Sequence, residues 1–178
     1  MADVEMALLV VLRQEDAELS GAISDTHGDL GGKTRFGIAS KFHPELLAGT
    51  FYTTMSAIAA LQEAKGILAE QYAAPLALGD IKSQQIADGL LSFAVVAGPV
   101  TAVSALQQAV NMVFASGHGP LEQDGVMGVR TLDAVNGSQE VSLLDNFRLQ
   151  MIEHYKDICQ RDPSQLKFLC GWINRALA

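Results

Sequence analysis

Helical periodicity is the strongest constraint that this sequence places on its fold. Apolar residues recur at intervals of three and four along most of the chain, and proline or glycine interrupts the pattern between segments. Alanine and leucine dominate the hydrophobic residues, while runs of β-branched residues are short, which favours helix over sheet. We therefore expect an all-α, or mainly α, fold with helices at 4–15, 54–72, 83–97, 99 to about 113, 129–135, 141–161 and 163–177.

Local signals place several helix ends. Asp3 can cap the first helix, which ends near Glu15, and Gly98-Pro99 stops one helix and starts the next, as in a helical hairpin. Pro75 closes the helix over 54–72. On that helix the spacing predicts a buried face made of Ile58, Leu61, Ala64, Ile67 and Leu68.

The segment after the first helix lacks periodicity. Glycines, Asp25, Thr26 and Asp29 break the pattern between residues 20 and 32, which predicts a long irregular loop or a small hairpin. Loops of that length within a compact domain are usually functional. A second glycine-rich connector spans residues 116–128.

Length and charge exclude some classes of protein. The chain has 178 residues, enough for one domain or one domain with a small lobe, and a formal net charge of −8. Nucleic acid is excluded as a partner because no concentrated basic face is visible. No apolar run approaches the roughly 20 residues that span a bilayer, and the acidic start does not resemble a signal peptide.

Cys159 and Cys170 flank a turn, and we favour two free thiols over a disulfide.

Glu15 is the candidate catalytic residue. It lies where an apolar helix reaches the surface, facing a glycine-rich polar loop, which is the position of an acid catalyst of glycosidic bond cleavage. Partial burial there would favour the protonated form that a general acid needs. The alternatives are a solvated glutamate at a helix end, or Glu18 as the acid, and spacing alone does not exclude either.

Asp25 and Asp29 are candidates for a second carboxylate. Either one could lie opposite Glu15 to activate a water or to stabilise an oxocarbenium-like transition state, although aspartates in such loops usually cap turns. Thr34, Arg35 and Phe36 follow in the glycine-rich stretch and could line a groove for sugars, with Phe36 partly in the core.

No cofactor or metal ion is predicted. His27 and His43 lack a second ligand at suitable spacing, so loop or surface roles are expected for both. The chain also lacks the nucleophile elbow, the phosphate loop, the HExxH pattern and the EF-hand.

Two sequence stretches resemble the glycoside hydrolase family 108 lysozyme-like muramidases, which include phage endolysins and proteins described as secretion activators. Val11-Leu12-Arg13-Gln14-Glu15 is similar to the helix end that presents the family's catalytic glutamate. Gly31-Gly32-Lys33-Thr34-Arg35-Phe36-Gly37-Ile38 is similar to the family's Gly-Gly-x-Thr-x-aromatic-Gly-Ile stretch. The C-terminal half resembles the peptidoglycan-binding part that accompanies this catalytic region, with matches that include Ala105–Asn111, Asp124–Gly128 and Phe168–Arg175.

The resemblance implies a lysozyme-like N-acetylmuramidase without a cofactor, with Glu15 as the acid and Tyr72 among the substrate-binding residues. It implies a catalytic region at 1–97 and a peptidoglycan-binding region at 98–178, packed as one unit. The protein would be made in the cytoplasm and would act at the bacterial wall or in the periplasm, after release by a holin or an export system.

Departures from the family pattern support an alternative. The family's Glu-Gly-Gly-Tyr motif is replaced by Glu15-Asp16-Ala17-Glu18, and the spacing between Glu15 and the paired glycines is longer. Ser92 stands where the family has aspartate, Val96 stands where it has asparagine, and Tyr72-Ala73-Ala74-Pro75 lacks the family's tryptophan. The alternative is a catalytically impaired protein of the same fold that binds peptidoglycan or takes part in secretion.

Overall fold

The computed structural model describes residues 1–25, 32–113 and 120–177, and the fold is mainly α-helical, as predicted. The helices are α1 (Val4–Glu15), α2 (Ala57–Ile67), α3 (Gln84–Ala97), α4 (Pro99–Val113), α5 (Val129–Gly137), α6 (Glu140–Arg161) and α7 (Leu166–Leu177). Shorter helical turns are η1 (Pro44–Ala48), η2 (Leu68–Ala73), η3 (Ala74–Leu76), η4 (Leu78–Asp80) and η5 (Pro163–Gln165). A small antiparallel hairpin joins β1 (Thr34–Arg35) to β2 (Ile38–Ala39), with Thr34 opposite Ala39.

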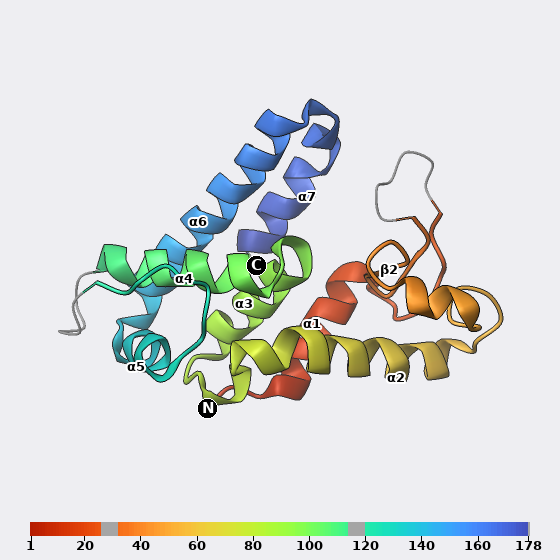
Figure 1. The fold of residues 1–178 in the computed structure, drawn as a ribbon, viewed down its shortest axis with the longest axis horizontal. Helices are drawn as coiled ribbons and strands as arrows, with labels where there is room; N and C mark the ends of the chain where they lie inside the picture. The colour runs from red at the N-terminus through yellow and green to blue at the C-terminus, as the bar shows by residue number, and fades with distance from the viewer. Residues whose placement is uncertain (26–31, 114–119, 178) are drawn as a thin grey trace.

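Helix α3 is the centre of the core. Its residues Leu90, Leu91, Phe93 and Ala94 are fully buried, because α1, α4 and α6 all contact it. Figure 1 shows α3 in the middle of the molecule, with α1 and α2 on one side and α4 to α6 on the other. The buried apolar residues of both halves of the chain form one hydrophobic cluster.

Helices α6 and α7 form an antiparallel hairpin that projects from this core (Figure 1). Its turn is the Pro163–Gln165 segment, and the Asp162 carboxylate caps that turn by accepting a bond from the Ser164 N–H at 3.0 Å. Tyr155 of α6 is buried between Phe93 of α3, at 5.6 Å between ring centroids, and Trp172 of α7, at 5.4 Å. These rings attach the hairpin to the core.

Most of the expected helix ends are confirmed. Asp3 caps α1, and Gly98-Pro99 separates α3 from α4, with Gly98 at a φ of +86° that few other residues adopt. The helix expected over 54–72 instead begins at Ala57, because the Ser56 hydroxyl accepts the Ala59 N–H and caps it there.

The buried face expected for that helix is partly wrong. Ile58 is 77% exposed, whereas Ala60, Ala64 and Leu68 are buried. The segment therefore packs through Ala60, Ala64 and Leu68, with Leu61 and Ile67 partly buried against the core. No helix within the three described ranges has both the length and the apolar character needed to cross a bilayer.

Candidate active-site cleft

Glu15 is the last residue of α1, and the backbone leaves the helix directly after it. Ala7, Leu8, Val11 and Leu12 bury the inner face of α1, so the end of the helix is fixed against the core. The Asp16 carboxylate then accepts bonds from the Ser20 hydroxyl at 3.0 Å and from the Gly21 N–H at 2.7 Å. Desolvation raises the pKa of Asp16, but these hydrogen bonds outweigh it and hold the pKa below its ordinary value.

The turn of the hairpin packs closely against the Glu15 side chain. Phe36 and Gly37 form the two-residue turn between β1 and β2, and both have positive φ, at 51° and 78°. A Cβ atom on Gly37 would lie only 2.6 Å from the Glu15 Cγ. The glycine is therefore needed both for its backbone conformation and for its close approach to the glutamate.

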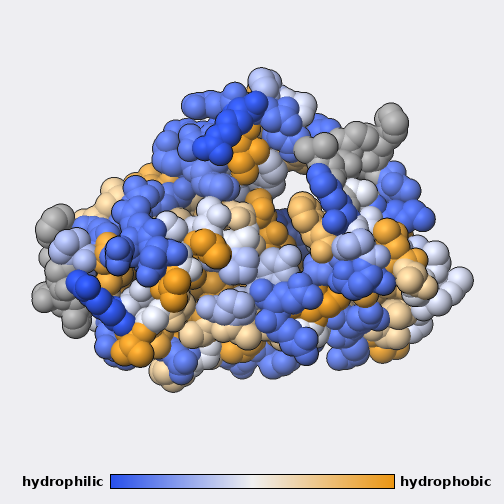
Figure 2. Space-filling view, in the orientation of Figure 1, coloured by the Kyte–Doolittle hydropathy of each residue, from blue (hydrophilic) through white to orange (hydrophobic). Residues whose placement is uncertain are grey.

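Glu15 opens into a cleft of about 420 Å³. One wall is the hairpin with the residues that follow it, the base includes the ends of α3 and η2, and the other wall is η5 and α7. In Figure 2 this face of the molecule is hollowed beside the projecting α6–α7 hairpin. The cleft is lined by Glu15, Thr34, Gly37, Ala39, Phe42, His43, Tyr72, Val95, Val96, Gln165, Phe168, Trp172 and Arg175.

Arg175 of α7 forms an ion pair with Glu15 across the cleft. The distance between Arg175 Nη2 and Glu15 Oε1 is 2.7 Å, and the two side chains are only 18% and 21% exposed. Sequence reasoning did not identify Arg175 as a site residue. A signal was nevertheless present, because Phe168, Trp172 and Arg175 follow one another at helical spacing and so share a face of α7.

Among the predicted sugar-binding residues, the structure brings Thr34 and Tyr72 to the cleft with Glu15. Burial raises the pKa of the Tyr72 hydroxyl. His43, for which a loop or surface role was expected, lies in the loop between β2 and η1 and also lines the cleft. It is 3% exposed, and its Nδ1 lies 3.1 Å from Glu45 Oε1.

Arg35 and Phe36 lie in the core and not at the cleft. The Arg35 guanidinium donates to the backbone carbonyls of Gly21 at 2.8 Å and Phe51 at 2.7 Å, and the residue is 5% exposed. A buried guanidinium needs such partners, so its donors are used inside the fold and not on a sugar. The Phe36 ring is buried against Gly21, consistent with its expected packing role.

The structure does not bring a second carboxylate to Glu15 within its described part. Asp25 is exposed and is absent from the described lining of the cleft, and Asp29 lies outside the described residues. The described residues also contain no cluster of three or more side chains that could hold a metal ion. The roles of Asp25 and Asp29 stay predictions.

Two positions that depart from the family pattern, Ser92 and Val96, lie on α3, and Val96 lines the cleft whereas Ser92 does not. The Ser92 hydroxyl donates to Gln14 Oε1 at 2.6 Å, so it supports the residue before Glu15. Val95 and Val96 contribute apolar surface to the cleft itself.

Comparisons with known proteins agree with this description. Residues 12–98 match the family model described as glycosyl hydrolase 108, and residues 101–177 match the model described as a predicted peptidoglycan domain. The solved structure of Brucella abortus SagA has the same fold, with a TM-score of 0.69 and 23% identity over 97% of this chain and 92% of that one. No curated protein matches the chain.

The two family matches meet at the break between α3 and α4, and residues from both form the cleft. They confirm the resemblance drawn from the sequence and give the chain a function related to peptidoglycan. The chain is thus similar to the glycosyl hydrolase 108 family over residues 12–98 and to the predicted peptidoglycan domain over residues 101–177.

Proposed function

We propose that this protein is a peptidoglycan hydrolase that cleaves the glycan strand between N-acetylmuramic acid and N-acetylglucosamine. The observation that carries the proposal is the position of Glu15, a partly buried carboxylate at the edge of an open cleft. The cleft lies between a region similar to a glycosyl hydrolase and one similar to a peptidoglycan domain. A glycan strand is long and narrow, and an open cleft admits the middle of such a polymer.

Glu15 would act as the general acid. It would donate a proton to the glycosidic oxygen as the bond to the anomeric carbon breaks, while water attacks that carbon. Asp29 or Asp25 is the candidate base, and a separation of roughly 6.5 to 9.5 Å between the carboxyl groups would give inversion of configuration. The hydroxyl groups of Thr34 and Tyr72 would form hydrogen bonds with the hydroxyl and acetamide groups of the sugar.

The Glu15→Gln variant tests the role of Glu15. The amide keeps the shape of the side chain and removes the proton, so wall clearing should fall by roughly a hundredfold or more while the melting temperature changes little. Release of reducing ends from purified peptidoglycan measures the effect. Glu18→Gln is the matched control, because Glu18 is an exposed carboxylate three residues away and should keep full activity. Equal activity of E15Q and wild type would remove Glu15 from the mechanism.

A second candidate function is peptidoglycan binding without hydrolysis. Two observations favour it: Glu15 is paired with a guanidinium, and Val95 and Val96 present apolar surface beside it. Sedimentation of the wild-type protein with insoluble peptidoglycan, without release of reducing ends, would establish this function in place of the enzyme. In either case we place the site of action at the bacterial wall, reached through a holin or an export system.

A further inference from the structure

The face of α7 that lines the cleft ends at the candidate acid. Phe168, Trp172 and Arg175 occur at intervals of four and three residues, so they stack along one side of the helix. Of the three, Arg175 forms an ion pair with Glu15. A charged residue from the C-terminal region therefore contacts the glutamate of the N-terminal region directly.

The Glu15 side chain has contacts at both of its ends. Gly37 packs against the aliphatic part of Glu15, and Arg175 binds the Oε1 atom at the other end of the side chain. Within the described residues, Glu15 Oε2 has no hydrogen-bond partner. The carboxyl group thus has one oxygen in an ion pair with Arg175 and one without a hydrogen-bond donor among the described residues.

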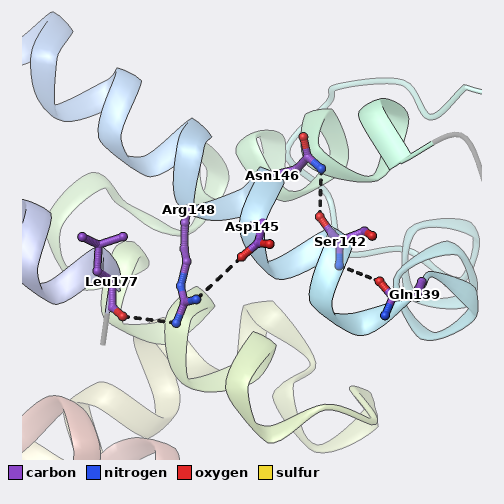
Figure 3. A network of polar contacts seen from close by, with 6 residues as sticks. All are labelled: Gln139, Ser142, Asp145, Asn146, Arg148 and Leu177. Atoms are coloured by element: carbon purple, nitrogen blue, oxygen red, sulfur yellow. Dashed lines mark hydrogen bonds and ion pairs between the residues drawn. The ribbon is translucent and has the colours of Figure 1, made fainter.

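Contacts on both sides of Arg175 fix the C-terminal end of helix α7. Trp172 stacks on the buried Tyr155, and Ala176, next to Arg175, is 5% exposed. At the end of the helix the Arg148 guanidinium of α6 donates to the Leu177 carbonyl at 3.2 Å and lies 3.8 Å from the Asp145 carboxylate (Figure 3). A cation at the last carbonyls of a helix also matches the negative end of the helix dipole. The Arg175 backbone therefore has little freedom to move.

We propose that Arg175 is a positioning residue that orients Glu15 for proton donation. Arg175 Nη2 lies 2.7 Å from Glu15 Oε1 in an ion pair, and a guanidinium presents only N–H groups and a positive charge. A proton on the carboxyl group must then be carried by the other oxygen, Oε2. Arg175 thereby directs the acidic proton into the cleft. What Arg175 contributes in this proposal is the orientation of the carboxyl group. This inference rests on the proposed hydrolase function.

The Arg175→Met variant removes the donors and keeps a long side chain. We expect kcat on soluble peptidoglycan fragments to fall by roughly tenfold to a hundredfold, because a misplaced catalytic group costs rate, with KM changed less than about twofold. Arg175→Lys keeps a positively charged hydrogen-bond donor, although with a different geometry, and should recover part of the lost kcat. Arg161→Met is the matched control, since Arg161 lies on the same hairpin with its side chain 80% exposed, and it should behave as wild type.

The kinetic outcome separates the alternatives. An Arg175→Met protein with raised KM and wild-type kcat would make Arg175 a substrate contact and overturn the positioning role, as would unchanged kinetics. If Arg175→Met does not fold, Arg175→Lys decides: lowered kcat at unchanged KM supports the role, and wild-type kcat overturns it. Failure of the wild-type protein to hydrolyse peptidoglycan would overturn the proposed function together with this inference, whereas hydrolysis that is insensitive to Arg175 overturns the inference alone.

Discussion

At the scale of single residues, Gly37 is the position where backbone and site depend on each other most closely. A Gly37→Ala substitution adds a Cβ atom 2.6 Å from Glu15 Cγ at a φ of +78°. We expect it to lower the free energy of unfolding by roughly 1 to 3 kcal/mol, because the left-handed conformation is strained for alanine. We also expect most of the wall-clearing activity to be lost, because Glu15 must move. Thermal melting and a reducing-end assay measure the two effects.

Gly66→Ala is the control for that substitution. Gly66 lies in α2 with nothing within 4 Å of an added Cβ, so alanine there should stabilise the protein by roughly 0.5 to 1 kcal/mol and leave activity unchanged. If Gly37→Ala keeps full activity, the contact between the turn and Glu15 does not set the position of the acid.

At the scale of secondary-structure elements, Tyr155 shows what fixes the α6–α7 hairpin. Its ring packs between Phe93 and Trp172, but its hydroxyl is buried and has no hydrogen-bond partner among the described residues. A buried unpaired hydroxyl costs roughly 1 to 3 kcal/mol, so Tyr155→Phe should melt at the same temperature or higher. Tyr155→Leu loses the ring contacts and should melt lower. A clear loss of stability in Tyr155→Phe would show that the hydroxyl, and not the ring, holds the hairpin.

At the scale of the whole molecule, His154 links stability to pH. Burial lowers the pKa of His154 below 6.5; the Asp157 charge opposes this shift, and Arg161 adds to it. The unfolded chain therefore binds a proton at His154 more readily than the folded protein does, so this residue reduces stability as pH falls below about 6.5. Melting temperatures of wild type and His154→Gln, compared at pH 7 and pH 5, should show a smaller acid-induced drop in the variant. An equal drop in both proteins would assign the effect to other groups.

The features that sequence predicted well are those with local causes. Asp3 and Gly98-Pro99 are capping and breaking signals that act over a few residues, so the ends of α1, α3 and α4 followed from the sequence. The buried face expected for α2 was wrong at Ile58, because residue spacing alone does not reveal that Ala60, and not Ile58, lies on the side that meets the core.

The candidate site was predicted less completely, because its parts are distant in sequence. Glu15, Thr34 and Tyr72 were identified from the sequence, but Arg175 meets Glu15 only through the packing of α7 against the core. Arg35 illustrates the opposite case. A guanidinium in a glycine-rich polar stretch suggests a ligand contact, and only the fold reveals that two backbone carbonyls use its donors.

One hydrophobic cluster joins both matched regions, which limits how the two regions can be exchanged between related proteins. Here α3 packs on α1, α4 and α6 at once, and α7 supplies one wall of the cleft that contains Glu15. A chimera that takes its first half from one relative and its second half from another would need matched core residues on both sides, so the two regions should be transferred together.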